Sequence, residues 1–134
     1  MTRGMLLTVL ARLEGVDTNG GSIWYEKGVV WAVENGLSDG SAAEGNITRE
    51  QLAVILFRYA QMKGMNAVTL EENLVGYTDG IAISDYAVQA MNWAVGKGII
   101  TGISGSELAP QGSATRAQVA TMLHRFCLLM AQAG

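Results

Sequence analysis

Three segments of the chain share a helical pattern of apolar residues, and each opens with a Thr-Arg pair. In the middle segment, apolar residues recur three and four positions apart, which is the spacing of one face of an α-helix: Leu52, Ile55, Leu56 and Tyr59. The other two segments carry equivalent stripes: Leu6, Val9, Leu10 and Leu13, and Val119, Met122, Leu123 and Phe126. The pattern predicts three helices that begin after Thr2, Thr48 and Thr115 and pack against one another through these stripes.

The predicted helix starts carry capping residues. Thr48 is followed by Gln51, and Thr115 by Gln118, at the spacing of a capping box. In that motif the threonine oxygen accepts from a backbone amide in the first turn and the glutamine side chain reaches back to the threonine amide. Thr2 is followed by methionine at that position, so only half of its cap is expected.

A second block also occurs twice, because residues 15–40 and 77–102 align without a gap. The identical pairs are Asp17 and Asp79, Trp31 and Trp93, Ala32 and Ala94, Val33 and Val95, Gly36 and Gly98, and Gly40 and Gly102. An apolar stripe predicts a helix in each copy, over residues 25–33 and 87–95, with Ser84 as the N-cap of the second. Gly36 and Gly98 stand where a left-handed residue ends a helix.

These blocks define a repeating unit of helix, loop and Thr-Arg helix. The predicted organisation is a single domain over residues 1–134, with a partial first repeat at 1–14, a second repeat at 15–62, a connection at 63–76 and a third repeat at 77–134. Within the connection, Thr69 and Glu72 have the spacing of a helix start. The predicted fold is all-α, with three pseudo-repeats of helix-loop-helix around a central three-helix bundle and the first repeat truncated.

Composition narrows the function classes. Hydrophobic residues make up 49% of the chain and charged residues 16%, which favours a compact fold over disorder. A net charge of −3 argues against nucleic-acid binding, which usually requires a basic face. One cysteine and one histidine exclude an internal disulfide and a multi-histidine metal site. The apolar runs are too short to span a bilayer, and the first residues show no signal-peptide pattern.

The candidate chemistry lies at the helix starts. Arg3, Arg49 and Arg116 each occupy the first turn of a predicted helix, where the helix dipole disfavours a cation. Guanidinium groups beside helix-start amides would form a receptor for a carboxylate or phosphate. The alternative is a structural ion pair with Asp17 or Asp79. A second set of arginines follows at a constant interval on each helix and is interpreted as structural: Arg12, Arg58 and Arg125.

The aromatic residues leave two interpretations open. Trp24 and Tyr86 share one repeat position beside the predicted arginine sites, where they could stack on a sugar ring or pack in the core. Trp31 and Trp93 are expected in a groove wall or the core. Cys127 is expected to be a packed thiol, and His124 receives no role.

These motifs resemble the S-layer homology domain family. The resemblance rests on ITREQLAVILFRYA at residues 47–60 and ATRAQVATMLHRF at residues 114–126, each preceded by a WAV block and a glycine. It implies a pseudo-threefold prism whose grooves bind cell-wall glycopolymer, commonly through a pyruvylated sugar, and hold surface proteins on the wall of Gram-positive bacteria. Carried over by position, the implied polysaccharide-binding residues are Arg3, Arg49, Arg116, Asp17, Asp79, Trp24, Tyr86, Gly36 and Gly98.

The predicted function is a non-catalytic cell-wall-anchoring module that binds an anionic secondary cell-wall polysaccharide through arginine-lined grooves. It would act outside the cell, at the surface or wall. An alternative is a helical protein-interaction or assembly module, with self-association through the face left bare by the truncated first repeat. No catalytic residue, metal, cofactor, nucleic acid or membrane partner is predicted, because the sequence contains no nucleophile–base arrangement or metal cluster.

Overall fold

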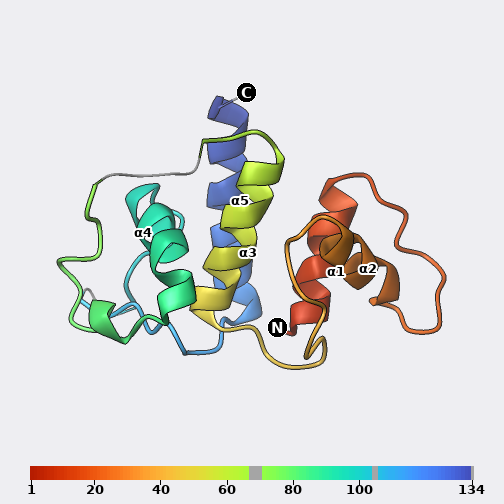
Figure 1. Cartoon of the computed structure of the whole chain (residues 1–134), viewed down its shortest axis with the longest axis horizontal. Coiled ribbons are helices and arrows are strands. Elements are labelled where there is room, and N and C mark those ends of the chain that lie inside the picture. The colour runs from red at the N-terminus through yellow and green to blue at the C-terminus, as the bar shows by residue number, and fades with distance from the viewer. Residues whose placement is uncertain (67–70, 104–105, 134) are drawn as a thin grey trace. The chain divides into compact units, whose positions relative to one another are not determined.

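In the computed structural model, the described residues are 1–66, 71–103 and 106–133. They form five α-helices and two short 3-10 helices (Figure 1): α1 (Arg3–Leu13), α2 (Glu26–Glu34), α3 (Arg49–Met62), η1 (Gly80–Ala82), η2 (Asp85–Ala87), α4 (Val88–Gly96) and α5 (Arg116–Ala133). Within those ranges the only β pairing consists of isolated bridges. The prediction of an all-α fold is confirmed.

The helices fall into two compact units, Met1–Ile47 and Thr48–Gly134. The first unit holds α1 and α2, and the second holds α3, α4 and α5 with the two 3-10 helices. Each unit therefore pairs a Thr-Arg helix with the helix that follows it in the chain. The predicted repeat boundaries and the central three-helix bundle stay predictions.

In the first unit, α1 and α2 pack closely because α2 presents a glycine to α1. A Cβ atom on Gly28 would lie 2.7 Å from both the Cα and the Oγ1 of Thr8. Leu6 and Leu10 of α1 and Ala32 of α2 are fully buried. Close backbone approach at a glycine thus lets two short helices bury their apolar faces.

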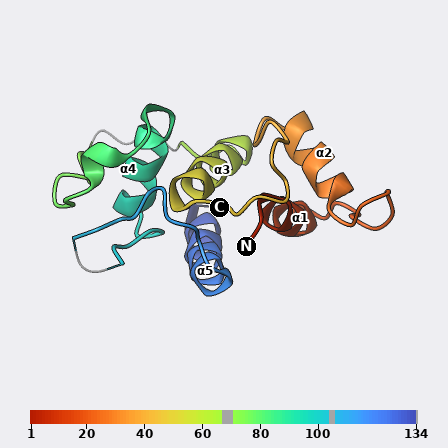
Figure 2. The ribbon, with the colours of Figure 1, turned by 90° about the horizontal axis from the view of Figure 1, so that it is seen from below.

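In the second unit, α3, α4 and α5 meet at a cluster of aromatic side chains. Trp93 on α4 lies edge-on to Phe57 of α3, with ring centroids 5.6 Å apart, and to Phe126 of α5, at 6.4 Å. Tyr59 stacks on Phe126 at 5.6 Å. Figure 2 shows α3 beside both α4 and α5. Trp93 has no exposed surface, so its place is in the core rather than in a groove wall.

The predicted helix ends are confirmed in detail. Thr48 and Gln51 form both bonds of the capping box, and Thr115 and Gln118 do the same. The Thr2 hydroxyl accepts from the Met5 amide at 3.2 Å, which is the half of the cap that its incomplete motif predicted. At the other helix ends, two glycines adopt left-handed φ angles of 72° and 73°: Gly36 and Gly98.

One local prediction holds in part and another was wrong. Ser84 occupies the N-cap position of η2, just before α4, but its side chain makes no capping bond, and its hydroxyl donates to the buried carboxylate of Glu50 at 2.7 Å. Cys127 is exposed on α5 rather than packed, since the stripe of α5 that meets the core runs through Val119 and Phe126 instead. The predicted helix start at Thr69 lies outside the described residues.

Candidate anion-binding site

The start of α3 is tied to the loop before α5 by backbone hydrogen bonds. The amide of Arg49 donates to the Gly112 carbonyl and that of Glu50 to the Pro110 carbonyl, both at 2.9 Å. The next amide, of Gln51, is capped by Thr48 at 3.2 Å. At the start of α3, the amides predicted to bind an anion are therefore already occupied, so that part of the prediction was wrong for this helix.

The first unit repeats this arrangement. The Arg3 amide donates to the Gly45 carbonyl at 3.0 Å, and the Gly4 amide donates to the Ala43 carbonyl at 2.8 Å. In each loop an alanine takes a left-handed φ, of 50° at Ala42 and 49° at Ala109. The two loops differ in sequence, so their shared conformation was not predicted, although a glycine precedes Thr48 and Thr115 at the same distance.

The Arg49 side chain is held by backbone carbonyls on two loops. Its Nε donates to the Leu108 carbonyl at 2.7 Å and its Nη2 to the Thr101 carbonyl at 2.8 Å, with 3% of the residue exposed. Burial lowers the pKa of the Arg49 guanidinium, and the charge of Asp79 acts in the opposite direction. Arginine nevertheless keeps its proton in proteins, so the structure holds a buried, oriented cation here.

Asp79 holds the loop whose Leu108 carbonyl accepts from Arg49. Its carboxylate accepts from the Leu108 amide at 2.9 Å and from the Ala109 amide at 2.8 Å. Burial alone would raise the pKa of Asp79, but these two backbone bonds, together with the charge of Arg49, lower it below its ordinary value. Asp79 thus fixes the loop whose Leu108 carbonyl accepts from Arg49.

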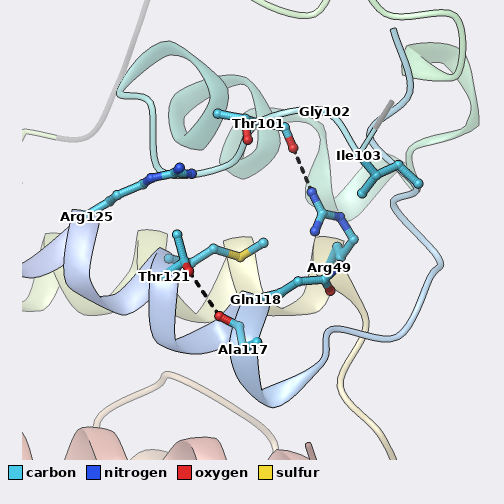
Figure 3. Close-up of a pocket in the computed structure, with 9 residues that line it drawn as sticks. Arg49, Thr101, Gly102, Ile103, Ala117, Gln118, Thr121 and Arg125 are labelled. Atoms are coloured by element: carbon cyan, nitrogen blue, oxygen red, sulfur yellow. Dashed lines mark hydrogen bonds between the residues drawn. The ribbon is translucent and has the colours of Figure 1, made fainter. Parts of the chain in front are cut away.

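Arg49 lines an open cavity of about 330 Å³ inside the second unit. The residues around it are Arg49, Thr101, Gly102, Ile103, Ala117, Gln118, Thr121, Met122 and Arg125. Figure 3 shows the guanidinium groups of Arg49 and Arg125 reaching toward the Thr101–Ile103 backbone from two helices, α3 and α5. The cavity combines two cations with hydroxyl, amide and apolar walls.

Arg125 was predicted to be a structural residue, yet it lines the cavity. The cavity, however, brings together one arginine from the start of α3 and another from the body of α5. The signal that could have found it is the tertiary packing of the two helices.

The remaining predicted site residues lie elsewhere. Arg3 donates to the Ser41 carbonyl at 3.2 Å, and Asp17 accepts from the Asn19 amide at 2.9 Å, both in the first unit. Arg116 is exposed at the start of α5 and is not among the residues that line the cavity. Gly36 and Gly98 are exposed helix ends.

The two aromatic candidates are exposed. Trp24 is 57% exposed and Tyr86 is 59% exposed, so packing in the core was the wrong alternative for both. Trp24 lies edge-on to Tyr25 with ring centroids 5.2 Å apart. Neither Trp24 nor Tyr86 lines the cavity around Arg49, so their contact with a sugar stays a prediction.

Two negative findings concern the described residues only. Among them, no group of three or more histidine, cysteine, aspartate and glutamate side chains is placed to hold a metal ion. In the same ranges, no helix has the length and apolar character needed to cross a membrane.

Comparison with known proteins gives the class of the chain. Residues 76–120 match the model of the S-layer homology domain. The chain is 33% identical over 107 residues to an amylopullulanase from Thermoanaerobacterium thermosulfurigenes. It is 31% identical over 107 residues to the exoglucanase XynX from Acetivibrio thermocellus. Residues 76–120 therefore carry the sequence signature of the S-layer homology family, and the resemblance drawn from the motifs is confirmed.

The matched stretch is a small part of each relative. Both alignments cover 75% of this chain, but only 6% of the amylopullulanase and 10% of the exoglucanase. Domains of this family are in general non-catalytic modules that anchor surface proteins to the cell wall and bind its polysaccharides.

Proposed function

We propose that this chain anchors a surface protein to the bacterial cell wall by binding an anionic wall polysaccharide, with the cavity around Arg49 as a binding site. One observation carries the proposal: two guanidinium-bearing side chains line one open cavity of about 330 Å³. An anion in this cavity would accept charge-assisted hydrogen bonds from guanidinium groups, which are stronger than bonds between neutral groups.

The size and walls of the cavity suit one substituted sugar unit better than an extended chain. Binding cavities for small ligands start at roughly 300 Å³, and this one reaches about that volume. Thr101, Gln118 and Thr121 offer polar groups for hydroxyls, while Ile103 and Met122 offer apolar contact. A carboxylate carried on a sugar, such as a ketal-linked pyruvate, fits this combination.

Arg49 is suited to this role because it is oriented before any ligand arrives. Its Nε and Nη2 are bound to backbone carbonyls. Within the described part of the chain its Nη1 makes no hydrogen bond, so this nitrogen is available to an anion. A fixed side chain loses little conformational entropy on binding, which favours affinity.

The other predicted positions would belong to further contacts along the polymer. They are Arg3, Arg116, Asp17, Trp24, Tyr86, Gly36 and Gly98. All of them except the half-buried Arg3 are exposed, which is compatible with such contacts. Several weak contacts along one chain would raise the overall avidity. Asp79 would act indirectly, through the loop that it holds.

The test is sedimentation of the full chain with purified Gram-positive cell walls. We expect saturable binding that falls by about tenfold or more when the wall carboxylates are reduced to alcohols, because a charge-assisted bond is lost. Arg49→Gln should weaken binding to untreated walls by a similar factor. Binding that neither treatment changes would refute the proposal.

A further inference from the structure

We propose that Arg125, rather than the motif residue Arg116, is the second anion-binding residue of the cavity around Arg49. The inference rests on the proposed function and specifies which residues of the cavity recognise the charge. It departs from the repeat pattern, which selects the arginine at the start of each helix.

Arg125 and Arg49 reach the cavity from different helices. It is half-buried, lines the cavity, and enters it from α5, whereas Arg49 enters from α3. Figure 3 shows both guanidinium groups facing the Thr101–Gly102 backbone. An anion between them would therefore meet a donor from each of two helices.

The Arg125 side chain is held less tightly than the Arg49 side chain. Its Nη1 lies 3.5 Å from the Ile99 carbonyl, at the outer limit of a hydrogen bond. Arg49, in contrast, makes bonds of 2.7 and 2.8 Å to two carbonyls. The cavity thus has one fixed cation and one that can adjust, and the adjustable guanidinium can close on an anion without breaking a strong bond.

Arg116 provides the contrast. It carries the same charge on the same helix, but it is exposed at the helix start and lies outside the cavity lining. An exposed arginine adds only a screened, long-range attraction for the polymer. The repeat position alone therefore does not identify the recognising residue.

The test compares Arg125→Ala with Arg116→Ala, which removes the same side chain from the same helix. In sedimentation with purified cell walls, we expect Arg125→Ala to weaken binding about tenfold or more and Arg116→Ala less than about twofold. Arg125→Lys should fall between the wild type and Arg125→Ala, because it keeps the charge and loses the planar fork. Thermal unfolding of each variant shows whether the fold is intact.

A second measurement, by NMR, uses the wild-type chain and needs no variant. In the wild-type chain with ¹⁵N-labelled arginine, the Nε–H resonance of Arg125 should shift on addition of solubilised wall polysaccharide, and that of Arg116 should not. Equal binding by the two alanine variants, or an unmoved Arg125 resonance when polymer binds, would overturn the assignment of Arg125 and leave the proposed function standing. Absence of any binding by the wild-type chain would overturn both.

Discussion

Replacing Asp79 with asparagine tests how the cavity is held together. The Asp79 carboxylate accepts from the Leu108 and Ala109 amides at 2.9 and 2.8 Å. Asparagine has a single acceptor oxygen, and its NH₂ group cannot face a backbone N–H. The Asp79→Asn variant therefore loses one bond and converts the other from a charged to a neutral acceptor.

The expected cost follows from these two changes. A hydrogen bond to a charged group contributes about 1.5–3 kcal/mol and a neutral one about 0.5–1.5 kcal/mol, and partial exposure of Asp79 reduces both. We expect the free energy of unfolding to fall by about 2 kcal/mol and the melting temperature by roughly 5 °C. Affinity for wall polymer should fall as well, because the Leu108 carbonyl that orients Arg49 is no longer held.

The effect should depend on pH in a defined direction. The pKa of Asp79 in the folded chain is lowered from its ordinary value of 3.8. Its stabilising contribution is therefore fully present above the pKa of the unfolded chain and is lost as the pH falls through the lower folded-state pKa. The difference in stability between wild type and Asp79→Asn should shrink as the pH drops below about 4.

Urea unfolding at several pH values measures this difference, and Asp17→Asn is the matched control. Asp17 occupies the equivalent repeat position, but it is exposed and accepts only from the Asn19 amide at 2.9 Å. We expect that variant to change the free energy of unfolding by no more than about 0.5 kcal/mol. Equal effects of the two substitutions at neutral pH would refute the role given to Asp79.

Three further stability predictions can be measured by urea unfolding of the full chain. Gly28→Ala places a Cβ 2.7 Å from Thr8 and should cost about 1–3 kcal/mol. Gly76→Ala meets nothing within 4 Å, so it serves as the control, and a similar cost there would contradict the packing argument. Ala109→Gly removes a side chain at a φ of 49° and should stabilise by up to about 1 kcal/mol, whereas a loss would show that no strain was relieved. Glu50→Ala removes a 3%-exposed carboxylate that accepts three hydrogen bonds and should cost about 3 kcal/mol, and a cost under about 1 kcal/mol would contradict that network.

The features that the sequence predicted correctly depend on neighbouring residues. The capping box of Thr48 and Gln51 needs only residues in one helical turn, and the left-handed Gly36 and Gly98 end helices whose apolar stripes are visible in the sequence. Trp93 was expected in the core or a groove wall because it lies on such a stripe, and it is buried there.

The features that the sequence did not predict depend on contacts between distant segments. The Asp79 carboxylate meets the Leu108 amide from a different loop, and the Arg49 side chain meets the Thr101 carbonyl. No local spacing encodes these contacts, because they arise only when the loops fold back on the start of α3. For the same reason, Arg125 could not be placed in the cavity of Arg49 from positions on a single helix.

The most direct test of the account is a backbone amide map of the full chain titrated with solubilised wall polysaccharide. We predict that the shifted resonances cluster at Thr101–Ile103 and at four residues of α5 that line the cavity: Ala117, Gln118, Thr121 and Met122. The same polysaccharide with its carboxylates reduced to alcohols should not shift these resonances. Shifts that lie away from the cavity, or that are equal for the native and the reduced polymer, would contradict the claim that the two arginines recognise an anionic saccharide.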